Sequence, residues 1–158
     1  MLLFFYLTLH FKTRPKPKVK EKKETIIALL EEAYKLRVSN LKRSKELCKE
    51  GLTLSIEIDD KALIGKSLNL LSLFSMIMGD HQHSLEMAQE AIVYFEALGD
   101  EKGIADAKYN IASINYKTDN YHLGLVNLID CITIYRKFHD YHYAVFSRTL
   151  SCCQKIEL

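Results

Sequence analysis

Hydrophobic and polar residues recur along residues 24–158 with the spacing of helices that are apolar on one side. Leu71 and Phe74 are typical of the apolar positions, which lie three and four residues apart, and polar residues such as Glu86 fill the positions between them. This spacing places the apolar side chains on one stripe of an α-helix. The pattern predicts seven helices, at 24–38, 41–58, 62–78, 82–98, 102–118, 122–138 and 142–156.

The pattern repeats along the chain at a fixed interval. When the sequence is shifted so that Asp60 falls on Asp100, Asp100 falls on Asp140, and the apolar positions of 64–74 fall on those of 104–114. A fixed period of this length is the signature of a repeat architecture. Because one helical hairpin cannot cover its own apolar stripe, successive hairpins must stack on one another. The sequence therefore predicts an all-α fold of about 3.5 stacked hairpins, in which the seventh helix shields the last one or begins a further pair.

Short segments rich in Gly, Asp and Asn separate the predicted helices. Gly79-Asp80, Gly99-Asp100 and Asp119-Asn120 are the clearest examples. Glycine suits the left-handed residue after a helix, and an Asp or Asn side chain can cap the first amides of the next one. These segments are predicted to be the turns between helices.

Small residues recur at equivalent places, where two helix backbones would have to approach closely. They are Ser72, Ser84 and Ala91 in one unit and Ala112 and Gly124 in the next. With Leu68, Leu71, Gly79-Asp80-His81 and Ala88, and with Lys108, Ile111, Asp119-Asn120-Tyr121 and Leu128, these units resemble the tetratricopeptide repeat in its longer bacterial form. The family's proline after the second helix is absent, and several of its aromatic positions hold Ser, Asn or Ala. The resemblance implies a right-handed α-α superhelix.

The resemblance also implies a concave groove lined by the first helix of each pair. Lys66, Lys117 and Arg148 would hold an acidic group or a carboxyl terminus, and Asn69 would bond to a peptide backbone. The family's carboxylate clamp of two Lys and two Asn is not reproduced, so a chaperone tail is not the expected ligand. The full set of implied groove residues is Lys66, Asn69, Leu73, Asp106, Tyr109, Ser113, Lys117 and Arg148.

Charge is concentrated before the repeats. The chain has 158 residues and a formal net charge of +2, but residues 12–23 carry seven basic residues against one acid, a net charge of +6. That segment also holds both prolines, Pro15 and Pro17, and is interpreted as a linker, with contact to nucleic acid or anionic lipid as the alternative. The remainder is mildly acidic, which argues against a nucleic-acid-binding body.

Residues 1–11 are apolar but fall short of the roughly 20 residues that a membrane-spanning helix needs. They are interpreted as the end of a membrane helix, an apolar segment that packs elsewhere, or a consequence of the chosen start. Membrane contact through residues 1–23 therefore remains an alternative to a purely cytoplasmic location. The cysteines show no paired spacing and are expected to be free, buried thiols in a reducing compartment: Cys48, Cys131, Cys152 and Cys153.

Motifs for chemistry are weak. Gly65-Lys66-Ser67 ends a string that resembles a phosphate loop, but Asp60 stands where that motif needs glycine, and no strand precedes it. The histidines lie at predicted turns without the converging ligands that zinc requires. No Ser, His and Asp share a turn that would form a nucleophilic site. We therefore expect no enzyme activity, metal, cofactor or small-molecule substrate.

Three hypotheses about function follow. The first is a protein- or peptide-binding adaptor, the sensory or docking part of a bacterial signalling system. The second is a module that forms homo-oligomers through the seventh helix or through Phe4 and Phe5. The third is a regulator tethered to a membrane or a nucleic acid through residues 12–23.

Overall fold

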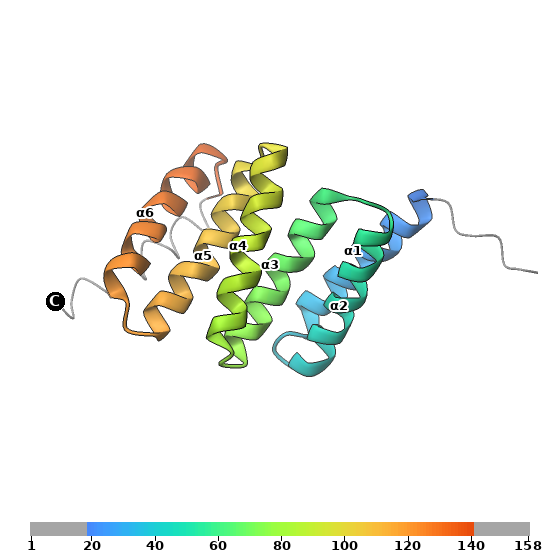
Figure 1. Cartoon of the computed structure of the whole chain (residues 1–158), viewed down its shortest axis with the longest axis horizontal. Coiled ribbons are helices and arrows are strands. Elements are labelled where there is room, and N and C mark those ends of the chain that lie inside the picture. Colours follow the sequence, from blue (N-terminus) through green and yellow to red (C-terminus); the bar gives the residue numbers. More distant parts are fainter. Residues whose placement is uncertain (1–18, 141–158) are drawn as a thin grey trace, which may run out of the picture.

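A computed structural model describes residues 19–140, which form six α-helices and no strand (Figure 1). Short connections join each helix to the next. The all-α prediction is confirmed for this part of the chain, and the predicted helix at 142–156 lies outside it. The helices are α1 (Val19–Leu36), α2 (Leu41–Glu57), α3 (Lys61–Ile77), α4 (His81–Leu98), α5 (Glu101–Lys117) and α6 (Tyr121–Lys137).

The first helix begins earlier than predicted. α1 starts at Val19 rather than at residue 24, so the interpretation of residues 19–23 as linker is wrong. Lys22 and Lys23 also contact the next hairpin boundary, where Lys22 pairs with Glu57 at 3.0 Å and Lys23 with Asp60 at 2.7 Å. These ion pairs join α1 to the end of α2 and the start of α3. The spacing of residues within one helix does not predict them. Residues 1–18 lie outside the described part of the chain.

The turns recur at regular intervals, as the sequence predicts. Asp60, Asp80 and Asp100 each accept a hydrogen bond from the backbone N–H three residues later, at 3.1, 3.3 and 2.9 Å. Gly79 and Gly99 take the left-handed conformation that ends the preceding helix. Within residues 19–140, the left-handed turn residues other than glycine are Asp59, Asp119 and His139.

The helices pack in chain order and form two layers. α3 contacts α1 and α5 in addition to its sequence neighbours, whereas the even-numbered helices of residues 19–140 make no comparable contacts with one another. Figure 1 shows the succession from α1 and α2 at one end to α6 at the other. The odd-numbered helices therefore form a continuous layer, which places equivalent residues of α1, α3 and α5 side by side.

The core follows the predicted stripes. Leu71 and Phe74, on the stripe that the sequence identifies, are buried, and so are Phe95 and Tyr135 on the helices that pack against it. The small residues lie at close helix contacts, since the Ser84 hydroxyl donates a hydrogen bond to the Ser72 carbonyl at 2.7 Å. This bond joins α3 directly to α4.

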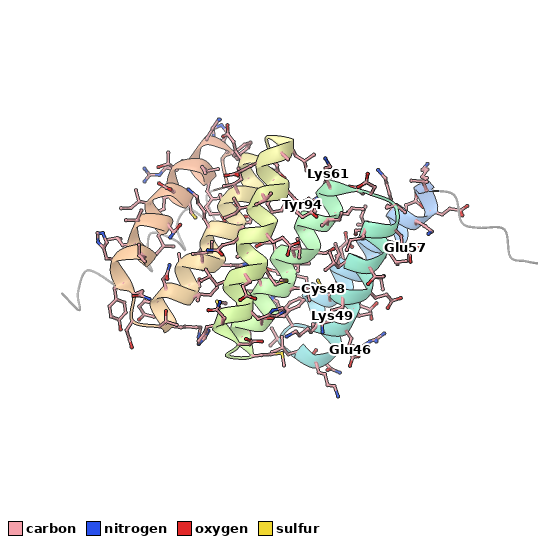
Figure 2. The ribbon with its side chains drawn as sticks, viewed as in Figure 1. Glu46, Cys48, Lys49, Glu57, Lys61 and Tyr94 are labelled. Atoms are coloured by element: carbon pink, nitrogen blue, oxygen red, sulfur yellow. The ribbon has the colours of Figure 1, made fainter. Side chains whose placement is uncertain are left out.

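The cysteines of the described residues are free and buried, as predicted. Cys48 lies where α2 meets α3, and its Sγ is 3.2 Å from the Ser67 carbonyl (Figure 2). Cys131 makes the same contact with the Ala105 carbonyl across α5 and α6. The next residue of α2 after Cys48, Lys49, is exposed, whereas Cys48 lies on the packed side of the helix. The thiols thus belong to the helix contacts, and Cys152 and Cys153 lie outside the described residues.

Candidate functional site

Two adjoining cavities open on the layer of odd-numbered helices. We call them the charged cavity, of about 650 Å³, and the apolar cavity, of about 740 Å³. They share Tyr34, Asn69, Leu70 and Asp106, so together they form one groove across α1, α3 and α5. We call it the inner groove. It runs along the helices, with the charged cavity at the N-terminal halves of α3 and α5 and the apolar cavity further along.

Most residues implied by the family resemblance line this groove. Lys117 is exposed on α5 and lines neither cavity, and Arg148 lies outside the described residues. The other six predicted residues line one or both cavities: Lys66, Asn69, Leu73, Asp106, Tyr109 and Ser113. The repeat register explains why they meet, because it puts equivalent positions of α3 and α5 on the same layer.

The contribution of α1 was missing from the sequence prediction. The groove residues Ile27 and Tyr34 of α1, and Val38 in the turn after it, occupy the same register positions as Lys66, Leu73 and Ile77 of α3. The sequence does contain this information, since the first helix aligns with the third when the repeat shift is shortened by one residue. Extending the groove to that helix would have found them. The cavities are also lined by Leu30, Glu31 and Lys35 of α1 and by Arg37, which follows α1.

Asn69 is held in place by a second asparagine. The side-chain amide of Asn110, which is only 5% exposed, donates to the Asn69 carbonyl at 3.0 Å and to Asn69 Oδ1 at 2.7 Å. Since Oδ1 accepts this bond, the Nδ2 group of Asn69 keeps its donors for other acceptors. Asn69 lines both cavities, so these donors lie where the two cavities meet.

The apolar cavity is walled by aromatic and aliphatic side chains. The Arg37 guanidinium lies over the Tyr34 ring, 3.8 Å from its centre, and Val38 is 87% exposed. Tyr109 is half-buried, and burial raises the pKa of its hydroxyl to about 12, so it is neutral at physiological pH. Leu73 adds a half-buried aliphatic surface. Such a cavity suits a large apolar side chain.

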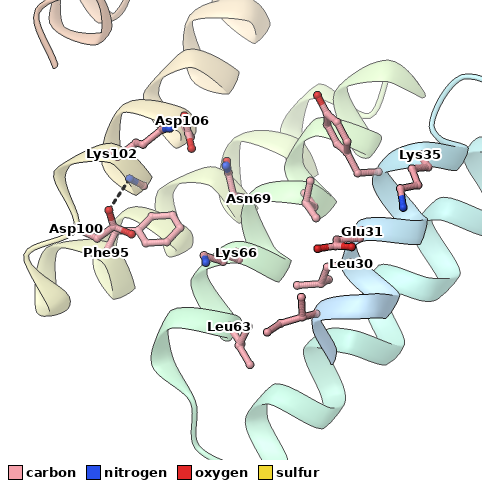
Figure 3. Close-up of a pocket in the computed structure, with 14 residues that line it drawn as sticks. Leu30, Glu31, Lys35, Leu63, Lys66, Asn69, Phe95, Asp100, Lys102 and Asp106 are labelled. Carbon is pink, nitrogen blue, oxygen red and sulfur yellow. Dashed lines mark hydrogen bonds between the residues drawn. The ribbon is translucent and has the colours of Figure 1, made fainter. Parts of the chain in front are cut away.

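The charged cavity combines acids and bases from all three helices (Figure 3). Asp106 accepts a hydrogen bond from the Tyr135 hydroxyl at 2.8 Å. Burial raises the pKa of Asp106, while the Tyr135 bond and the nearby Lys102 oppose that rise. Lys102 pairs with Asp140 at 2.7 Å, and this bond raises the pKa of its ammonium group. The charge of Lys102 is thus largely balanced by a residue outside the cavity lining.

Phe95 lines the charged cavity and lies between two glycines. A Cβ atom on Gly103 would lie 2.5 Å from the Phe95 ring, and one on Gly65 would lie 2.9 Å from it. Both glycines therefore make room for this ring. Gly65-Lys66-Ser67 lies inside α3, where the Ser67 hydroxyl donates to the Leu63 carbonyl at 2.8 Å. This segment is helical, as predicted for 62–78, and has no phosphate-loop geometry.

The described residues hold no group of three or more His, Cys, Asp or Glu side chains that could bind a metal ion. Burial raises the pKa of the Cys48 and Cys131 thiols to about 12, so both are protonated at neutral pH and are poor nucleophiles. Among the helices of residues 19–140, none has the length and apolar character needed to cross a membrane. No protein-family model matches the chain, and no curated protein sequence matches it significantly.

Proposed function

We propose that the chain is a peptide- or protein-binding adaptor that holds an extended segment of its partner in the inner groove. We also propose that its hairpins follow the right-handed superhelix of tetratricopeptide repeats, that the seventh helix extends the array, and that it serves as a docking or sensory part of a bacterial signalling system. The partner's backbone would accept hydrogen bonds from Asn69. Its apolar side chains would enter the apolar cavity.

One observation carries the proposal. Residues that the repeat register places on one face of α3 and α5 line two adjoining cavities, together with the equivalent residues of α1. An extended peptide needs backbone hydrogen bonds for affinity and pockets for alternate side chains for specificity. Asn69 supplies donors for the backbone hydrogen bonds, and Tyr34, Leu73 and Tyr109 line a pocket for a side chain.

Selection of peptides from a random display library against the full chain tests the proposal. Selected peptides should bind with dissociation constants that rise about tenfold in Leu73→Ala, because truncating an anchor contact typically costs more than about 1 kcal/mol. Val93→Ala is the matched control, since Val93 is 63% exposed on α4, away from both cavities. Fluorescence anisotropy measures both variants.

Binding that Leu73→Ala leaves unchanged, or that Val93→Ala weakens as much, would contradict a role for the inner groove. Lys117→Ala tests whether the peptide binds at the cavities alone or also along the rest of the predicted face. Because Lys117 lines neither cavity, binding at the cavities alone should be unchanged in this variant. The self-association and tethering hypotheses rest mainly on segments outside residues 19–140 and stay predictions.

A further inference from the structure

Three aspartates occupy equivalent positions, and two of them pair with a lysine of the preceding odd-numbered helix. Asp60 pairs with Lys23 of α1, and Asp140 pairs with Lys102 of α5, each at 2.7 Å. The third is Asp100. In α3, the register position of Lys23 and Lys102 holds Ala62, once the slip of one residue in α1 is allowed for. The lysine found at the other two aspartates is therefore missing here.

The consequence, within the described residues, is an aspartate at the cavity without a cation bound to it. No Lys, Arg or His of residues 19–140 forms an ion pair with Asp100. Its Oδ1 accepts the Gly103 backbone N–H at 2.9 Å, which is the dashed line of Figure 3. The carboxylate lines the charged cavity, where a ligand can reach it.

The other charges of the cavity leave room for one more cation. Glu31, Asp100 and Asp106 line it as acids, and Lys35, Lys66 and Lys102 line it as bases. Lys102 is bound to Asp140 and also interacts electrostatically with Asp100 and Asp106, so with Asp140 included four carboxylates face three lysines. Phe95 contributes an aromatic ring to the same cavity, and cations are attracted to aromatic faces.

We infer that the charged cavity binds a lysine or arginine of the partner peptide, whose cationic group takes the place at Asp100 that Lys23 and Lys102 occupy at Asp60 and Asp140. This inference rests on the proposed function and adds the charge of the ligand to it. Asp106 lines the same cavity and is a second acceptor for the incoming group.

The adjoining apolar cavity sets the spacing of the motif. Asp106, the second acceptor, and Ser113 of the apolar cavity lie two turns apart on α5, or about 10 Å along the helix. An extended peptide covers about 3.4 Å per residue, so about three residues span this distance. The expected ligand carries a basic residue about three positions from a large apolar one.

The test uses the full chain and short fluorescein-labelled peptides with a leucine and, three positions away, a guest residue. Guests are Lys, Arg, Gln and Glu, and a further peptide presents a free amino terminus in place of the guest. Lys and Arg peptides should bind about tenfold more tightly than the Gln peptide, as expected for one hydrogen-bonded charge. The Glu peptide should bind most weakly. The free-terminus peptide separates a side chain from a chain end as the source of the cation.

Two variants test Asp100 and Ala62 directly. Asp100→Asn retains a good helix cap but removes the charge, so the preference for Lys over Gln should disappear. Ala62→Lys supplies an internal lysine and should abolish the same preference, whereas Ala62→Met, of similar length and uncharged, should retain it. Circular dichroism verifies that each variant is folded.

The outcomes distinguish the two proposals. Peptides that bind in the inner groove with equal affinity for Lys, Gln and Glu guests would overturn the inference and leave the adaptor function standing. A preference for Lys that survives both Asp100→Asn and Ala62→Lys would also overturn it. Failure of every peptide to shift groove resonances in NMR spectra would overturn both proposals.

Discussion

The hairpins α3–α4 and α5–α6 lie one repeat apart and are built from different side chains. Leu68 is buried in the first, whereas its equivalent in the second, Lys108, pairs with Asp130 at 2.7 Å. Phe95 of the first packs between Gly65 of the same hairpin and Gly103 of α5. Its equivalent in the second, Tyr135, donates a hydrogen bond from its hydroxyl to Asp106. At these positions the first, which we call the apolar hairpin, has apolar packing, and the second, the polar hairpin, has polar contacts.

This difference shows what the repeat has to retain. Helix length and small residues at close contacts are common to both hairpins, while the large residues change. The backbone geometry therefore depends on spacing and on room for close approach. The large residues are free to set local stability and the chemistry of the inner groove.

The largest effect is expected where α5 of the second hairpin packs most tightly against Phe95 of the first. Gly103→Ala places a Cβ 2.5 Å from the Phe95 ring and should lower the free energy of unfolding by about 2 kcal/mol, because overpacking a filled site forces side chains to move. Urea denaturation measures the loss. Adding Phe95→Leu should recover part of it, so that the two changes are not additive. Additive losses would show that the ring is not the obstacle.

The polar hairpin should respond less and in a pH-dependent way. Tyr135→Phe removes the hydrogen bond to Asp106 and should cost about 1 kcal/mol at pH 7. Burial raises the pKa of Asp106, so folding favours its protonated form, and the stability it contributes falls as pH rises through the unfolded and then the folded pKa. The bond opposes this rise in pKa. Its removal should extend the decline to higher pH.

Urea denaturation between pH 3 and pH 7 measures this effect. The difference between wild type and Tyr135→Phe should be smallest at pH 3, where the carboxyl group is protonated in both. Tyr121→Phe is the control, because it also removes a hydrogen bond from a tyrosine hydroxyl to an aspartate, Asp119, but at an exposed position. A loss for Tyr135→Phe that is constant with pH would mean that the hydroxyl acts through packing alone.

The sequence predicted those features that depend on spacing along one helix. The stripe through Leu71 and Phe74, the caps at Asp80 and Asp100, and the shared face of Lys66 and Asp106 all follow from the periods of the helix and of the repeat. Each needs only the distance in sequence. Binary patterning carries that information directly.

Features that depend on distances between helices were not predicted. The bond from Asn110 to Asn69, the Lys108–Asp130 pair and the start of α1 at Val19 each depend on which side chains meet across a contact. No pattern within one helix specifies that. Lys117 shows the same limit, because it shares the predicted face but lies beyond the last α5 residue that lines the cavities.

The smallest effect is expected from moving one feature of the polar hairpin into the apolar one. Ala62→Lys places a lysine where α5 has Lys102, within reach of Asp100, and should stabilise the chain by about 0.5 kcal/mol, the usual value of an exposed ion pair. Ala62→Gln is the uncharged control.

The pH dependence of this gain follows from the equivalent pair. The Lys23 bond to Asp60 lowers the pKa of the Asp60 carboxyl group, so the stabilisation from this pair is present above the unfolded-state pKa and is lost as pH falls through the folded-state pKa. The gain from Ala62→Lys should have the same sign, present at pH 7 and absent at pH 2, and should shrink in about 1 M salt. Equal stability of the Lys and Gln variants at pH 7 would show that the repeat register does not bring position 62 to Asp100.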